Sequence, residues 1–451
     1  MNDTQPPVDA PRARAVDARL GVIVRLAAPV MLAHLTEPLL GLVDATVIGR
    51  LGQVHLLGAV AIGAIVFDVL FWGLGSLRLS TAGLTAQAYG AGDDREVARA
   101  MARALTLAGL LGAALIALQV PIAAATLRLM EASPPVAEAA RVYIFIRIWS
   151  APFALANYAV LGSLVGRART DLALGLQVFI NLSKIGFTLA FVPGLGWGIA
   201  GAASATVIAE ILGAAAGLTL LARIGALPRG ISLAEVLEAR ALKRMLAVNR
   251  DVAIRTLALL TAFGFFTAQG ARSGDLTLAA NAVLYNLFLF GSYFLDGFAT
   301  AAEQLCGQAI GARDEGGFRK AARSVLALSV GAGAAVTLIL LAGGTAFIDF
   351  VSTNPDVRRE AAAYLLFAAL TPLVGATAFA FDGIFIGATW TRAMRNLMLI
   401  SLALYLATFY AARGWSNAGL WTAFLVFLGS RGIGQALTFT PMTRRAFRKA
   451  R

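Results

Sequence analysis

Gln87-Ala88-Tyr89-Gly90-Ala91 returns as Gln308-Ala309-Ile310-Gly311-Ala312, which lies 221 positions later (308 minus 87). Two further motifs repeat at nearly the same spacing. Gly166-x-x-x-Thr170 returns as Gly387-x-x-x-Thr391, and Gly196-Trp197-x-x-Ala200-Gly201 returns as Gly414-Trp415-x-x-Ala418-Gly419. A repeat of this length in a very apolar chain predicts two similar helical bundles.

The composition indicates a membrane protein. Hydrophobic residues make up 59% of the chain and charged residues only 14%, against about 25% charged residues in soluble proteins. Apolar stretches of about 20 residues recur along the whole chain, and each is long enough to cross a bilayer. The net charge of +13 would favour nucleic acid as a partner of a soluble protein. Here most of this charge lies in short loops, so we expect no nucleic-acid partner.

The fold class predicted is an all-α polytopic membrane protein with twelve transmembrane helices in two pseudo-symmetric six-helix lobes. Residues 1–222 form the N-lobe, 223–245 a polar cytoplasmic linker, and 246–451 the C-lobe with a basic cytoplasmic tail. The predicted helices lie near 21–47, 56–84, 98–124, 138–165, 171–193, 197–222, 246–270, 278–308, 318–344, 359–387, 393–412 and 415–440.

Lysine and arginine predict the orientation. With the N-terminus inside, about 26 Lys and Arg residues lie on the inner side against about 7 on the outer side. Both termini are then cytoplasmic, and we expect a bacterial inner-membrane protein. Because six spans per half is an even number, both halves enter the membrane in the same sense, as in parallel-repeat transporters.

The sequence argues against an enzyme. The chain has one cysteine, Cys306, and two histidines, so no cysteine-based metal site or catalytic triad can be assembled. Gly196-x-Gly198-x-x-Gly201 matches the dinucleotide fingerprint in letters only, because it joins two membrane helices instead of following a strand. We expect no cofactor and no resident metal.

Ionisable residues inside membrane helices are the strongest functional signal, because each is costly in hydrocarbon. His34, Glu37, Gly41 and Asp44 recur at spacings of 3, 4 and 3, which places them on one face of the first helix. We expect Asp44 to have a functional role and Glu37 to assist it, with a purely structural ion pair as the alternative. His34 and Gly41 are expected at the substrate cavity, although a hydrogen-bonded structural contact also explains His34.

Lys184 lies in the middle of the fifth helix, near Asn181 and Thr188. The axial gap between Lys184 and Asp44 is about 8 Å at 1.5 Å per residue. The long Lys stem can bridge much of that gap. A pair that breaks and reforms would act as a proton or cation gate, and a permanent structural pair is the alternative.

Further charged residues lie within or near the spans. Arginines at 78, 147, 255 and 431 have acids at 68, 296, 303 and 382 as possible partners. The residues that we expect to line a substrate cavity, besides the two on the first helix, are Arg78, Gln177, Asp296, Glu303 and Asp382.

Several strings resemble the multidrug and toxic compound extrusion (MATE) family, in its DinF-like branch. They run from residue 20 to about 440. They include Leu42-Val43-Asp44-Ala45-Thr46-x-x-Gly49-Arg50, Leu77-Arg78-x-Ser80-Thr81-Ala82-Gly83, Leu295-Asp296-Gly297-Phe298-Ala299 and Asp382-Gly383-x-Phe385-Ile386-Gly387.

The resemblance implies two six-helix lobes, a central cavity and efflux coupled to H⁺ or Na⁺. It also implies a coupling site that joins the first-helix acid, here Asp44, to an Asn and an Asp on the fifth helix. Lys184 and Thr188 stand at those two positions, which disfavours a sodium site of the usual kind. Asp382 resembles a C-lobe acid of some relatives only loosely. We therefore favour H⁺ over Na⁺ and the N-lobe as its site.

Three functions compete at this stage. The first is an exporter of amphipathic small molecules driven by protons or sodium, working as a monomer in contact with membrane lipid. The second is a flippase for lipid-linked precursors from the same superfamily, although flippases usually carry extra helices. The third is a membrane enzyme or scaffold, for which the sequence offers no polar catalytic cluster.

Overall fold

The computed structural model describes residues 13, 14, 16–227 and 230–448. The backbone of residues 37–39 and 54 is included, but their side chains lie outside the described part. No strand occurs within these residues. The elements of the first half are α1 (Leu20–Gly49), α2 (Val54–Leu74), α3 (Ser76–Gly90), α4 (Asp94–Ala117), α5 (Gln119–Leu129), α6 (Pro134–Arg147), η1 (Ile148–Ser150), α7 (Ala151–Gly166), α8 (Thr170–Leu189), η2 (Ala190–Gly194) and α9 (Gly198–Arg223).

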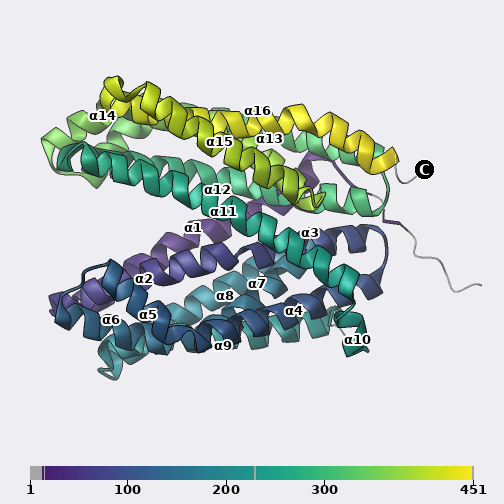
Figure 1. Cartoon of the computed structure of the whole chain (residues 1–451), viewed down its shortest axis with the longest axis horizontal. Coiled ribbons are helices and arrows are strands. Elements are labelled where there is room, and N and C mark those ends of the chain that lie inside the picture. Colours follow the sequence, from purple (N-terminus) through teal and green to yellow (C-terminus); the bar gives the residue numbers. More distant parts are fainter. Residues whose placement is uncertain (1–12, 15, 228–229, 449–451) are drawn as a thin grey trace, which may run out of the picture.

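The second half starts with a short surface helix and continues with long spans. Its elements are α10 (Leu233–Val236), α11 (Ala239–Arg272), α12 (Asp275–Gly311), α13 (Glu315–Val351), α14 (Pro355–Gly387), α15 (Thr391–Ala411), η3 (Arg413–Trp415) and α16 (Ser416–Arg448). Figure 1 shows α2 and α4–α9 in one layer and α12–α16 in the other, with α1 and α3 between them. The chain therefore forms the two predicted helical lobes.

Within the described residues, eleven segments are long and apolar enough to cross a membrane. The pairs α2–α3 and α6–α7 each count as one span. α16 is not among the eleven, and Arg431 and Gln435 interrupt its apolar run. It nevertheless packs along α14 and α15 and buries Trp421 and Phe424 in the C-lobe core. We take α16 as the twelfth of the predicted helices.

Glycine contacts reproduce the sequence repeat in three dimensions. A Cβ on Gly162 or Gly166 would meet the carbonyl oxygens of Arg78 or Ala82 on α3. Gly383 and Gly387, 221 positions later, face the carbonyl oxygens of Ala299 and Glu303 on α12. These residues again lie 221 positions after their counterparts on α3 (299 minus 78 and 303 minus 82). Each lobe thus contains an equivalent close-packed helix pair, α3 with α7 in one and α12 with α14 in the other. Small residues permit such close packing inside membranes.

The repeated Gln-Ala-x-Gly-Ala motif is where the two lobes meet. A Cβ on Gly90 would overlap the backbone of Gln308, and one on Gly311 would overlap the backbone of Gln87. Each motif therefore packs its glycine against the glutamine of the other. Residue 14 lies beside this contact, since its N–H donates to the Gly90 carbonyl oxygen. We call the end of the molecule that holds residues 14, 90, 311 and 448 the terminal face (Figure 1).

The first helix of each lobe reaches across to the other lobe near the terminal face. Ile23 and Leu26 of α1 pack in a core cluster with residues of α12, α13 and α14. Conversely, Met245 of α11 packs among residues of α4, α7 and α8, whereas Val248 already belongs to the C-lobe core. Figure 1 shows α11 running from the lobe of α10 into the other lobe. This exchange was not visible in the sequence.

The predicted linker at 223–245 is shorter than expected. α11 begins at Ala239, and only 224–238 separates it from α9. The polar composition of this region suggested a linker, but Arg240, Lys243 and Arg244 occupy one side of a helix whose other side buries Met245. α10 begins with a capping box, in which Ser232 accepts from the Glu235 N–H and Glu235 accepts from the Ser232 N–H.

Candidate functional site

An ion pair joins α1 and α8 at the end of the N-lobe away from the terminal face. Lys184 Nζ donates to Asp44 Oδ2 at 2.8 Å, and each side chain is only 15% exposed. Asp44 lies about one and a half turns before the end of α1, and Lys184 lies the same distance before the end of α8. The structure thus brings together the two residues that the sequence singled out. Such a pair loses hydration on both sides, and its geometry must offset that cost.

A chain of neutral hydrogen bonds continues from this pair along the same helix contact. Gln177 Nε2 donates to Asn181 Oδ1 at 3.0 Å, and Asn181 Nδ2 donates to Thr36 Oγ1 at 2.8 Å. Thr36 in turn donates to the carbonyl oxygen of Ala33. Asn181 therefore fixes α8 to α1 about two turns before Asp44 on α1 and about one turn before Lys184 on α8. Gln177, which we expected at the substrate cavity, belongs to this α1–α8 contact.

Other residues that the sequence predicted at the coupling site or on the same stripe of the first helix make no described bond to the ion pair. Thr188 is fully buried, and its hydroxyl has no hydrogen-bond partner among the described residues. Gly41 is exposed, and no heavy atom lies within 4 Å of the position that a Cβ would take. The side chain of Glu37 lies outside the described residues. The first-helix stripe therefore contributes Asp44 to the α8 contact.

Two polar residues that the sequence analysis did not single out lie near the ion pair. Asn157 Nδ2 of α7 donates to Glu210 Oε2 of α9 at 2.7 Å. Glu210 interacts electrostatically with both Arg147 and Lys184, and Asp68 of α2 interacts with the same two cations. Glu210 could have been found from the sequence, because it is a lone acid within the apolar segment of the sixth predicted span. Among the described residues of the N-lobe, Asp44, Asp68 and Glu210 thus act on Arg147 or Lys184.

Arg147 is held within the N-lobe by aromatic rings. Its guanidinium donates to the Tyr143 hydroxyl at 3.0 Å and lies 4.5 Å from the centre of the Phe67 ring. A cation over a ring face is attracted by the ring quadrupole. Because no carboxylate bonds Arg147 directly among the described residues, its charge remains shared between Asp68 and Glu210.

The C-lobe contains a separate, fully paired acid. Asp382 of α14 accepts from Arg255 of α11, from Arg431 of α16 at 2.6 Å, and from Gln435 at 2.7 Å. Its side chain is 7% exposed and that of Arg431 is 3% exposed. The pairing of in-span arginines with an acid, which the sequence predicted, is confirmed here. Two bound guanidiniums leave Asp382 little room for another cation, and its part in a substrate cavity stays a prediction.

The other predicted cavity residues lie between the lobes. His34 of α1 stacks on Tyr293 of α12 with ring centres 5.9 Å apart. Asp296, one turn further along α12, interacts electrostatically with His34 and Arg78. Glu303 is 3% exposed, and its Oε1 has no hydrogen-bond partner among the described residues. Arg78 is the cation that attracts its carboxylate. The structure therefore gathers these residues at the lobe contact, and their role toward substrate stays a prediction.

Comparisons with known proteins agree with this architecture. The MatE family model matches residues 29–192 and again residues 253–410, once in each lobe. DNA damage-inducible protein F of Escherichia coli (strain K12) is 39% identical over 414 residues, which cover 91% of this chain and 90% of that protein. "Probable multidrug resistance protein NorM" of Deinococcus radiodurans is 30% identical and covers 95% of this chain and 97% of that protein.

A solved structure shares the fold. The crystal structure described as MATE in the bent conformation superimposes with a TM-score of 0.87 at 20% identity, and the match covers 95% of this chain and 96% of that one. Its two-lobe arrangement is therefore also the arrangement of this chain.

Proposed function

This chain belongs to the MATE family, and from that membership and the geometry of the N-lobe we propose a proton-coupled antiporter that exports amphipathic small molecules. Its relatives include a protein named for multidrug resistance that covers nearly the whole chain. The two-lobe fold supports alternating access, in which the lobes rock around a site between them.

The Asp44–Lys184 pair is the observation that carries the proton coupling. The two charged atoms lie 2.8 Å apart in a contact that is mostly closed to water. When water reaches the pair, a proton competes with the Lys184 ammonium for the Asp44 carboxylate. Protonation removes the charge–charge attraction between α1 and α8 and leaves the Asn181–Thr36 hydrogen bond in place. Rearrangement of α1 would follow, because its first half packs on the other lobe.

The same geometry argues against sodium at this position. A sodium ion needs several oxygen ligands, whereas Asp44 already binds a fixed cation. Sodium would therefore have to displace the ammonium and leave it unpaired inside the protein, at a cost of several kcal/mol. Protons avoid that cost because they neutralise the carboxylate itself.

Lys184 supports a substrate preference. Its ammonium is bonded to Asp44 and loses that partner when Asp44 is protonated. A freed ammonium would favour an anionic or neutral amphiphile over an organic cation. We further propose that the terminal face is cytoplasmic in a bacterial inner membrane, since most Lys and Arg residues of the loops lie there.

Transport by purified protein in liposomes tests the proposal. Wild-type protein should concentrate a fluorescent anionic amphiphile against its gradient when a pH gradient is imposed. Asp44→Asn keeps the approximate shape of the side chain but cannot titrate, so it should lose accumulation while retaining downhill exchange. Full accumulation by a well-folded Asp44→Asn variant would contradict the coupling role.

Labelling of single cysteines tests the orientation. The chain's one cysteine, Cys306, is fully buried, so its background labelling should be low. Cysteines introduced at positions 235 and 313 should react with a membrane-impermeant reagent only after the cell is opened. Strong reaction in intact cells would reverse the orientation.

A further inference from the structure

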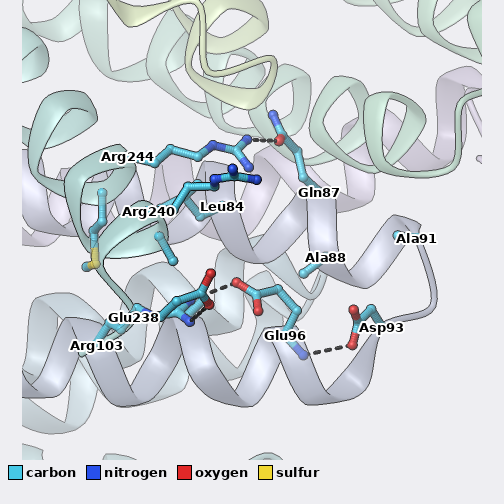
Figure 2. A pocket seen from close by; sticks show the side chains of 13 residues that line it. Leu84, Gln87, Ala88, Ala91, Asp93, Glu96, Arg103, Glu238, Arg240 and Arg244 are labelled. Carbon is cyan, nitrogen blue, oxygen red and sulfur yellow. Dashed lines mark hydrogen bonds and ion pairs between the residues drawn. The ribbon is translucent and has the colours of Figure 1, made fainter. Parts of the chain in front are cut away.

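A pocket opens on the terminal face between the N-lobe and the start of α11. It holds about 380 Å³ and is lined by residues of α3, α4 and the first turns of α11 (Figure 2). This volume lies within the range of small-molecule sites, about 300–1,000 Å³. None of the residues that line the pocket takes part in the proposed transport mechanism.

The acids that line the pocket already have partners. Glu96 accepts from Arg103 at 2.7 Å, and Glu238 lies 3.5 Å from the same guanidinium. Asp93 accepts from the Glu96 N–H and caps α4. Figure 2 shows these acids and Arg103 together on one side of the pocket. Each of these three acids is therefore bonded or paired to a group other than the arginines of α11.

Two guanidiniums on the opposite side have no carboxylate bonded to them among the described residues, although Glu96 attracts Arg244 from a distance. Arg244 donates to Gln87 Oε1 at 2.7 Å and to Thr389 Oγ1 at 3.4 Å, and both acceptors are neutral. Arg240 makes no hydrogen bond or ion pair with any residue that the structure describes. The two residues are four positions apart on one helix, so their side chains leave α11 on the same side. Both extend over the pocket in Figure 2.

This arrangement fits an oxyanion. Guanidinium groups bind phosphate oxygens through charge-assisted, often bidentate hydrogen bonds. Two of them one helical turn apart, above a pocket, can hold one phosphate group between them. We propose that this pocket binds a phosphate-bearing anion through Arg240 and Arg244. The rest of the cavity leaves room for a small group attached to that phosphate.

The position of the site ties the anion to the lobe contact. Gln87 belongs to α3 of the N-lobe and Thr389 to the C-lobe, and Arg244 bonds both. Gln87 also donates to the carbonyl oxygen of Gly387 at 2.8 Å. A bound anion would therefore sit on the residue that bridges the two lobes at the terminal face. Both a free phosphate compound and the headgroup of an anionic lipid have the required chemistry.

A binding measurement with matched variants tests the proposal. The whole protein in uncharged detergent is titrated with inorganic phosphate at constant ionic strength, and the midpoint of thermal unfolding is followed. Arg240→Gln is the main variant, because Arg240 has no described bond whose loss would unfold the protein. Lys243→Gln removes the same charge from the same helix without touching the pocket. In a second arm, phosphatidylglycerol retained per protein is counted by native mass spectrometry.

We expect wild-type protein and Lys243→Gln to bind alike, and Arg240→Gln to bind at least about tenfold more weakly, as for one lost charge-assisted hydrogen bond. If this difference appears with inorganic phosphate, a free phosphate compound is the ligand. If it appears only with phosphatidylglycerol, the ligand is a lipid headgroup. Equal binding by wild type and Arg240→Gln in both arms would overturn the proposal. An equal loss in Lys243→Gln would overturn it too, because binding would then follow net charge alone.

Discussion

Replacing Lys184 by Asn should shift the pH dependence of transport to higher pH. The substitution removes the ammonium that lies 2.8 Å from Asp44 and leaves a neutral side chain. An opposite charge within about 4–6 Å makes a carboxylate harder to protonate. Without that charge, Asp44 has no bonded cation that a proton must displace. The half-maximal point of pH-driven transport should therefore rise.

The distance sets the size of the shift. Two unit charges 2.8 Å apart attract by about 6 kcal/mol at an effective dielectric constant of 20 (332 divided by 20 and by 2.8). Desolvation of both groups offsets much of this gain, because each side chain is only 15% exposed. The net attraction is therefore well below about 6 kcal/mol. We expect its loss to move the transport profile measurably.

The assay is uptake into liposomes at a series of internal and external pH values. Lys184→Arg is the matched control, since it keeps the positive charge and should keep the wild-type profile more closely than Lys184→Asn. Each variant must elute as a single species before its profile is compared. A Lys184→Asn protein that transports with an unchanged pH profile would refute the reasoning, because the ion pair would then be purely structural.

Three further predictions concern structure more than coupling. Asp382→Asn should lower stability by about 3–5 kcal/mol, measured by thermal unfolding, because it leaves the buried Arg431 without its carboxylate; an unchanged midpoint would contradict this. Gly90→Val should cost about 1–3 kcal/mol and weaken the lobe contact, since its side chain would overlap the Gln308 backbone; unaltered stability and transport would argue against that contact. A hydrogen bond from the Ser232 N–H and contacts with arginines of α4 lower the pKa of Glu235 from 4.5 to about 2. The stability that the Glu235 carboxylate contributes should therefore be complete above pH 4.5 and disappear as the pH falls through 2. The difference in unfolding midpoint between wild type and Glu235→Gln should shrink over that range, and a constant difference would disprove the assignment.

The sequence predicted those features that depend on helix geometry alone. The spacing of the repeated motifs and the length of the apolar stretches were enough to predict the two lobes, because the repeated glycines must pack at equivalent places in each. Asp44 and Lys184 could be paired because rise per residue fixes their depth in the membrane. The in-span arginines predicted an acidic partner, and Asp382 fulfils that role.

Features that depend on packing between distant helices could not be predicted. The exchange of α1 and α11 between lobes rests on contacts of Leu26 and Met245 that no local pattern encodes. The Asn157–Glu210 bond joins helices from separate hairpins. The start of α11 was misplaced because a basic helical face has the same composition as a polar linker.

The most direct test of the account imposes the two ion gradients separately. Wild-type protein in liposomes is given a pH gradient with equal sodium on both sides, and then a sodium gradient with equal pH. The Asp44–Lys184 pair predicts accumulation of substrate in the first experiment and none in the second. Accumulation driven by the sodium gradient alone, or a strict need for sodium in the first experiment, would contradict proton coupling through this pair.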